Sequence, residues 1–158
     1  MRHFFLDTSA LVKAYSEEAG SRRVQNIIRG AKVQPPANRL VASTLVHPET
    51  ASALAQILDG PTAANRGFGQ LHRQELPGSL GGDLNTRVFL APADPHMDSA
   101  AALVWKHKLR GADAVHLATA LATRQDVPVD AEFYFVSSDV ALNRAAAAEG
   151  LEVINPAA

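Results

Sequence analysis

Segments of strand type and helix type alternate along the chain, and this alternation constrains the fold more than any other feature. Short apolar runs rich in aromatic and β-branched residues are typical of strands, and longer helical runs separate them. Such alternation favours a parallel sheet with helices on both faces. We therefore predict an α/β fold with three layers, α/β/α, around a central, mostly parallel five-stranded sheet. The predicted strands are residues 3–6, 39–43, 87–92, 132–138 and 151–156.

The predicted helices fill the intervals between these strands. Gly30 is expected to end the second helix, and Trp105 is expected to be a core residue rather than a surface for stacking nucleic-acid bases. Residues 60–82 contain several glycines and lack a regular period, so we expect a looser helical arm or a surface excursion there. The predicted helices are residues 9–15, 21–30, 43–60, 94–111, 112–125 and 139–150.

The length and composition indicate one soluble globular domain over residues 1–158, in which 47% of residues are hydrophobic and 20% are charged. The absence of cysteine excludes disulfides, thiolate nucleophiles and zinc–thiolate sites. Asp7 interrupts the first apolar run, so we expect no secretory signal, and no uncharged run is long enough to span a membrane. The expected location is the cytoplasm. The net charge of −1 does not by itself indicate nucleic-acid binding.

Two acidic residues stand where a predicted strand passes into a helix. Asp7 follows the first strand, and Asp139 follows the strand over residues 132–138. The carboxyl ends of parallel strands form the ligand-binding edge of an open α/β sheet. These two acids can therefore meet at that edge, although they are far apart in the sequence.

Two further acids lie on helical faces where an unpaired charge is unusual. Glu49 lies on the apolar face of its predicted helix, and Asp113 lies in the first turn of the helix over residues 112–125. Each acid needs a cation, a basic partner or a position at a rim. Taken one at a time, an acid at a helix start is usually a cap, and Glu49 would usually be a salt-bridged rim residue.

All four acids together favour a metal site over separate caps. Converging carboxylates repel one another and their pKa values rise, and a divalent cation removes that conflict. Oxygen ligands without cysteine suit Mg²⁺ or Mn²⁺. Such a site fits phosphodiester cleavage, because the metal lowers the pKa of water and neutralises charge on the phosphate.

Four segments resemble one protein family, in that family's order along the chain. They are FLDTSALVKAYSEEAGS, PETASAL, LRGADAVHLATAL and FVSSDVALNRAAAAEGLEVINP. The chain resembles the PIN-domain ribonucleases, and within them the VapC-type toxins of bacterial toxin–antitoxin pairs. DTSALVK alone could also pass for the first motif of haloacid-dehalogenase phosphatases. That family needs a second aspartate at the position of Ser9.

The resemblance implies a PIN-like domain with an acidic site and supporting hydroxyl groups. Asp7, Glu49, Asp113 and Asp139 would be the catalytic residues and the metal ligands. Thr8, Ser9 and Ser137 would be the supporting hydroxyls.

The implied activity is metal-dependent endoribonuclease cleavage of RNA phosphodiesters by a metal-activated water. The implied partners are RNA, a cognate antitoxin protein and a second copy of the chain in a homodimer. Two alternatives stay open: a PIN-type nuclease of RNA processing without an antitoxin, and a non-catalytic PIN-fold binding module. An adjacent small gene would favour the toxin, and the intact acid set disfavours the binding module.

Several basic residues are candidates for contacts with RNA, and one histidine is expected to be structural. Residues proposed to contact RNA phosphates are Arg66, Arg73, Lys106, Lys108 and Arg110, although a basic cluster is more often a solvated helix face. His116 lies near the site in sequence, and we expect it to be a packed or hydrogen-bonded core residue.

Overall fold

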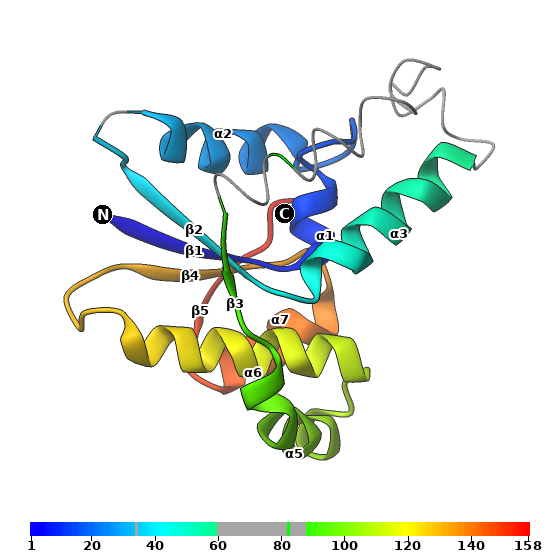
Figure 1. The fold of residues 1–158 in the computed structure, drawn as a ribbon, viewed down its shortest axis with the longest axis vertical. Helices are drawn as coiled ribbons and strands as arrows, with labels where there is room; N and C mark the ends of the chain where they lie inside the picture. Colours follow the sequence, from blue (N-terminus) through cyan, green and yellow to red (C-terminus); the bar gives the residue numbers. More distant parts are fainter. Residues whose placement is uncertain (34, 60–81, 83–87) are drawn as a thin grey trace.

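The computed structural model describes residues 1–33, 35–59, 82 and 88–158. One five-stranded sheet has the order β3-β2-β1-β4-β5, and every strand pair in it is parallel (Figure 1). The predicted α/β class and five-stranded sheet are confirmed. The strands are β1 Arg2–Leu6, β2 Asn38–Ser43, β3 Val88–Ala91, β4 Phe133–Val136 and β5 Glu152–Ile154.

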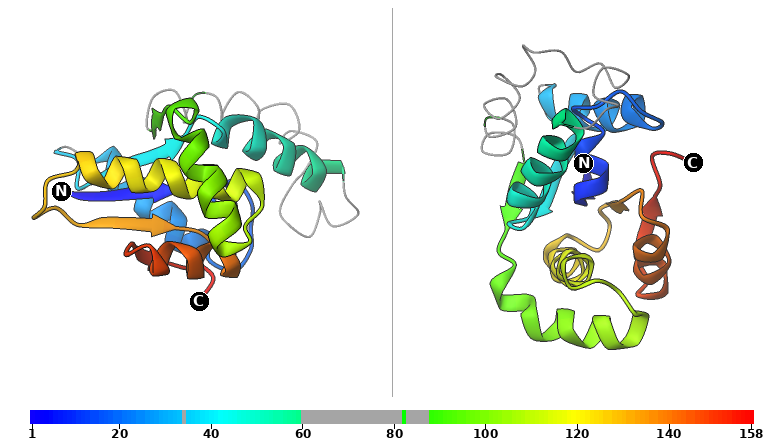
Figure 2. Two further views of the ribbon diagram at one scale, coloured as in Figure 1. Left: turned by 90° about the horizontal axis from the view of Figure 1, so that it is seen from below. Right: turned by 90° about the vertical axis from the view of Figure 1, so that its right-hand side faces the viewer.

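Helices cover both faces of the sheet. In Figure 1, α1, α2 and α3 lie on one side of the strands, and α5, α6 and α7 lie on the other. Figure 2 shows α5 as the outermost element on its side, beyond α6. The helices are α1 Thr8–Val12, α2 Ser21–Lys32, α3 Val46–Asp59, the 3₁₀ turn η2 Asp94–His96, α5 Met97–His107, α6 Gly111–Asp126 and α7 Val140–Ala148.

Alternating side chains of β1 supply two separate cores, one on each face of the sheet. Phe4 and Leu6 pack with residues of α1, α2 and α3, whereas Phe5 packs with residues of α5, α6 and α7. Neighbouring residues of a strand point to opposite faces, which explains this division. Because β1 is buried on both faces, its sequence is a continuous apolar run rather than an alternating one.

The order of the strands places a switch point at the centre of the sheet. The chain passes from β1 to β2 and β3 on one side, and then crosses to β4 and β5 on the other. Ligands in open α/β sheets bind beyond the carboxyl ends of the strands at such a point. Asp7 follows β1 and Asp139 lies three residues after β4, so both acids stand beside this point.

Two predictions about individual residues are wrong. Trp105 is not a core residue, because it is 77% exposed, whereas Leu103 of the same helix is buried. Residues two positions apart in a helix, such as Leu103 and Trp105, point about 200° apart around its axis. Trp105 therefore points away from the face that packs on α6. Gly30 does not end its helix, since α2 continues to Lys32. A side chain at Gly30 would collide with Asn38, whose amide donates to the carbonyl of Ile27.

The predicted arm over residues 60–82 lies outside the described residues, apart from Gly82. Within the part that is described, no helix is long and apolar enough to cross a membrane.

An ion-pair cluster joins the end of α5 to the end of α7. Glu149 lies 2.7 Å from Lys106 Nζ and is also hydrogen bonded to His107 Nε2. The hydrogen bond from Lys106, and then that from His107, lowers the pKa of Glu149. A lowered pKa stabilises the folded state above the unfolded-state pKa, and this contribution is lost as the pH falls through the folded-state value.

Replacing Glu149 with glutamine is therefore expected to lower the melting temperature at pH 7. The loss should be at most about 1 kcal/mol, because Lys106 is largely exposed. Melting curves of both proteins should converge only once the pH falls below the lowered folded-state pKa of Glu149, where the carboxyl is protonated in the folded protein as well. A difference that stays constant from pH 7 to pH 3 would contradict the ion-pair explanation.

Candidate active site

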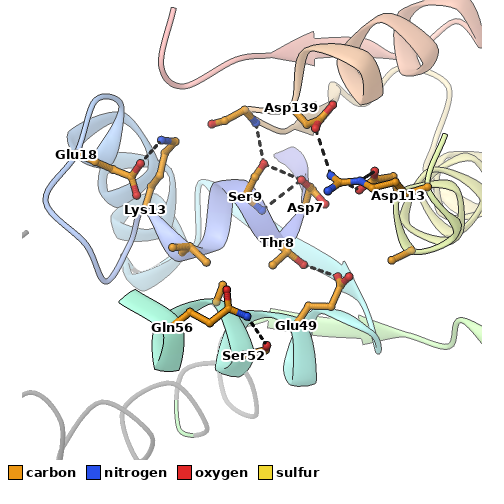
Figure 3. A pocket seen from close by; sticks show the side chains of 15 residues that line it. Asp7, Thr8, Ser9, Lys13, Glu18, Glu49, Ser52, Gln56, Asp113 and Asp139 are labelled. Carbon is orange, nitrogen blue, oxygen red and sulfur yellow. Dashed lines mark hydrogen bonds and ion pairs between the residues drawn. The ribbon is translucent and has the colours of Figure 1, made fainter. Parts of the chain in front are cut away.

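A pocket of about 650 Å³ lies at the carboxyl edge of the sheet (Figure 3). Its size is in the usual range of ligand-binding pockets. The first turn of α1, one face of α3 and the N-terminal ends of α6 and α7 contribute to its wall. The four predicted acids, Asp7, Glu49, Asp113 and Asp139, all line it.

Asp7 is the most enclosed of the four acids, with 3% of its surface exposed. It caps α1, and its Oδ2 accepts hydrogen bonds from the backbone N–H of Ser9 and from the hydroxyls of Ser9 and Ser137. The hydroxyl bonds measure 2.7 Å and 3.0 Å. None of these hydrogen bonds involves Oδ1, which lies 3.9 Å from His116 Nε2. The hydroxyls of Ser9 and Ser137 therefore both lie beside the first acid, although Ser137 precedes the last acid, Asp139, in the sequence.

Asp139 is both a helix cap and a pocket residue. Its Oδ1 accepts a hydrogen bond of 2.8 Å from the backbone N–H of Leu142, which caps α7. Its own N–H donates to the hydroxyl of Ser137, which in turn donates to Asp7. One serine thus joins the two strand ends and sets the relative position of their acids. Asp7 and Asp139 thus each cap a helix and also line the pocket.

Glu49 is held by two partners from other elements. The hydroxyl of Thr8 donates to Glu49 Oε2 over 2.7 Å, and His116 Nε2 contacts the same oxygen. His116 is 1% exposed, and its Nδ1 lies 3.0 Å from the hydroxyl of Ser43. The hydrogen bond from His116 is the largest of the effects that lower the pKa of Glu49, so this glutamate stays ionised.

The structure gives His116 a buried, hydrogen-bonded position, as the sequence predicted for it. It also gives this histidine a direct contact with a pocket acid. Burial lowers its pKa, but the bond to Glu49 and the charges of Asp7 and Glu49 together outweigh burial and raise it. His116 therefore fixes the position of Glu49.

Asp113 forms an ion pair with an arginine that lies one turn before it. Arg110 Nε is 2.7 Å from Asp113 Oδ2, and Arg110 Nη2 is 3.4 Å from Asp139 Oδ2. One guanidinium thus neutralises two acids that come from different helices. Burial of Asp113 raises its pKa, and the bond from Arg110 opposes that rise. The Arg110 side chain is 77% exposed, so it can leave the two acids without disturbing the core.

The pocket supplies ligand atoms that suit a hard divalent cation. In the described part of the chain, no group of three or more histidine, aspartate or glutamate side chains is arranged to hold a metal ion. Arg110 stands between Asp113 and Asp139 in this arrangement, and Glu49 is turned toward Thr8 and His116. The carboxylate oxygens are nevertheless of the chemical type that Mg²⁺ and Mn²⁺ bind.

Sequence reasoning did not identify Lys13 and Glu18 as pocket residues. Lys13 is buried, and its Nζ lies 2.9 Å from Glu18 Oε2. In Figure 3 this pair lies on the opposite side of the pocket from Asp113. The sequence signal for this pair is the lysine that ends the DTSALVK segment. Its pairing with Glu18 could not be inferred from the spacing of the two residues.

Unlike the four acids, the residues predicted to contact RNA, where the structure describes them, do not gather in the pocket. Arg110 lines the pocket, whereas Lys106 and Lys108 do not. Lys106 pairs with Glu149, and Lys108 Nζ lies 5.9 Å from the centre of the Trp105 ring. Arg66 and Arg73 lie outside the described residues.

Comparisons with known proteins agree with this architecture. The model of the PIN domain family matches residues 4–148. The fold is also similar to a chain in the crystal structure of VapBC2 from Rickettsia felis bound to a DNA fragment from their promoter. That similarity has a TM-score of 0.59 and 14% sequence identity, and it covers 97% of this chain and 98% of the other. Comparison with curated protein sequences gives no significant match.

The protein is thus a three-layer α/β/α protein with an all-parallel sheet and an acidic pocket at the switch point of that sheet. The family match covers most of the chain, and the chain therefore belongs to the PIN domain family, a family of nucleases.

Proposed function

We propose that this protein is a metal-dependent endoribonuclease of the VapC type, the toxin of a toxin–antitoxin pair. The observation that carries the proposal is the meeting of Asp7, Glu49, Asp113 and Asp139, from four separate segments, in one pocket. Membership of the PIN family and the similarity to a chain of the VapBC2 complex support it. We further propose an antitoxin protein that covers the pocket, and a homodimer of the toxin.

The cofactor in this proposal is Mg²⁺ or Mn²⁺, held by the four acids. When bound, the metal would lower the pKa of a water molecule and neutralise charge on the scissile phosphate. Ser9 and Ser137 hold Asp7 in place by donating to its Oδ2. The hydrogen bond from His116 keeps Glu49 ionised, so its carboxylate would be available as a metal ligand.

Arg110 has a second part in this proposal. Its guanidinium is exposed and lies at the edge of the pocket, beside Asp113 and Asp139. A phosphate that enters the pocket would offer this guanidinium a bidentate partner. The arginine would then leave the acids as substrate and metal arrive, and it would orient the phosphate.

Expression of the wild-type protein in a bacterial host is expected to arrest growth, and the Asp7→Asn variant is expected to remove the arrest. Asparagine caps helices as well as aspartate does, so α1 should persist while one metal-binding charge is lost. Growth curves at matched protein levels give the measurement. Asp130→Asn is the matched control, because Asp130 is exposed in the loop between α6 and β4. It should arrest growth like the wild type.

The outcomes separate the competing functions. Arrest that depends on Asp7 and is relieved by an adjacent small gene supports the toxin. Cleavage of purified RNA without arrest would favour a nuclease of RNA processing. Folded protein that neither arrests growth nor cleaves RNA with manganese would favour a binding module and contradict the proposal.

A further inference from the structure

The single tryptophan of the chain lies on the surface of the outer helix α5, five residues before Arg110, which lines the acidic pocket. Trp105 lies in the last turn of α5 and is 77% exposed. Isolated exposed apolar residues are common and need no function. A positive charge, however, lies next to this ring.

A lysine is held against the ring by an unusual backbone conformation. Lys108 ends α5 with φ of 59°, a left-handed conformation that residues other than glycine seldom adopt. Its Nζ lies 5.9 Å from the ring centre. Leu109, the next residue, is buried and anchors the turn. The turn therefore presents an aromatic face and a positive charge together.

The same turn leads directly to the acidic pocket. Arg110 follows Leu109, and its guanidinium contacts Asp113 and Asp139. Five residues can span at most about 18 Å from Cα to Cα, so the Cα of Trp105 lies within that distance of the Cα of Arg110, a residue that lines the pocket. Lys106 adds little positive charge to this surface, because it is paired with Glu149. Lys108 and Arg110 thus place two positive charges on the segment that leads along the chain from Trp105 to the pocket.

We propose that Trp105 is a base-stacking platform for single-stranded RNA, with Lys108 contacting an adjoining phosphate. The inference rests on the proposed ribonuclease function, because it concerns the substrate of the same pocket. Stacking on aromatic side chains beside basic residues is the usual mode of single-strand binding. The neighbouring exposed residues Ala101 and Ala102 are small, so the ring does not belong to a broad patch of large apolar side chains that could bury a protein partner.

Tryptophan fluorescence tests this proposal directly, because the chain has only one indole. A short unstructured oligouridylate is added to the wild-type protein in EDTA, so that cleavage cannot occur. The emission should be quenched in a saturable manner, and inorganic polyphosphate, which has no bases, should not quench it. RNA binding seen by anisotropy without a change in emission would overturn the proposal, as would the absence of any RNA binding.

Substitution of the ring should weaken binding by a predictable amount. Loss of one stacked base costs about 1–3 kcal/mol, so Trp105→Ala should raise the Kd about 5- to 150-fold. Trp105→Phe should recover most of the affinity. Phe89→Ala is the matched control, since Phe89 is 55% exposed and has Arg39 5.5 Å from the centre of its ring, but lies in β3 rather than on the segment that leads to Arg110. Its affinity should be unchanged, and equal weakening by both alanine variants would overturn the proposal.

Cleavage and oligomeric state separate the remaining outcomes. Trp105→Ala should raise KM and leave kcat at saturating RNA unchanged, whereas loss of an acid lowers kcat. Trp105-dependent binding without any cleavage by the wild type would defeat the ribonuclease proposal but leave the stacking site. If sedimentation shows that Trp105→Ala changes the oligomeric state, the ring serves an interface between copies and the stacking proposal fails.

Discussion

Replacing Asp113 with asparagine is expected to reduce RNA cleavage by more than about 100-fold while the protein stays folded. Changes to residues that merely support metal ligands cost about 10- to 100-fold, and loss of a ligand charge should cost at least as much. Asparagine has nearly the same shape as aspartate, so α6 should form as before. Asp113 is not the cap residue of this helix, because Arg110 occupies the cap position. Cleavage of a labelled RNA with manganese, at saturating RNA, gives the measurement.

A matched variant on the same helix controls for the change of charge. Asp126 is the last residue of α6, is exposed and lies outside the pocket, so Asp126→Asn should cleave RNA like the wild type. Circular dichroism should show the same helix content in both variants. If Asp113→Asn retains cleavage, Asp113 serves only to hold Arg110, and the four-acid site must be revised.

The positions of Asp7 and Asp139 could be predicted from the sequence because strand ends have fixed places in a parallel sheet. Each acid follows an apolar strand, and parallel strands end at a common edge. Glu49 and Asp113 could be predicted because each interrupts the pattern of its helix. These inferences need only local periodicity and the parallel order of the strands.

The partners of these acids could not be predicted in the same way. The contact between His116 and Glu49 joins residues 67 positions apart and depends on how α6 and α3 pack. Arg110 is close to Asp113 in the sequence, but its reach to Asp139 depends on the position of α7. The sequence predicts repulsion among the four carboxylates, whereas in the structure Arg110 and His116 are hydrogen-bonded basic partners for three of them.

The exposure of Trp105 shows a second limit of periodicity. An apolar residue in a helix suggests a buried face, but α5 lies outside α6 and is covered on one side only (Figure 2). Its buried residues Ala100 and Leu103 already fill that side. Which face of an outer helix is covered depends on the neighbouring layer, and this information is not local.

Manganese is expected to raise the melting temperature of the wild-type protein, and Arg110→Ala is expected to increase that rise. At about 100 times the Kd, binding adds about 2.7 kcal/mol, which corresponds to about 5–10 °C for a domain of this size. Arg110 neutralises Asp113 and Asp139 in the present arrangement, so its positive charge opposes a cation at the same acids. Removing it should leave the metal-free protein less stable and tighten manganese binding. Thermal melts over a manganese titration, reversed with EDTA, give both quantities.

Two controls assign the effect to the acidic pocket. Arg22→Ala removes an exposed arginine from α2 and should leave the manganese response unchanged. Asp7→Asn removes a proposed ligand and should lose most of the response, although its fold is kept. If Arg110→Ala binds manganese no more tightly than Arg22→Ala does, the arginine does not compete with the metal. If Asp7→Asn responds like the wild type, manganese binds elsewhere, and the acids of the pocket do not hold it.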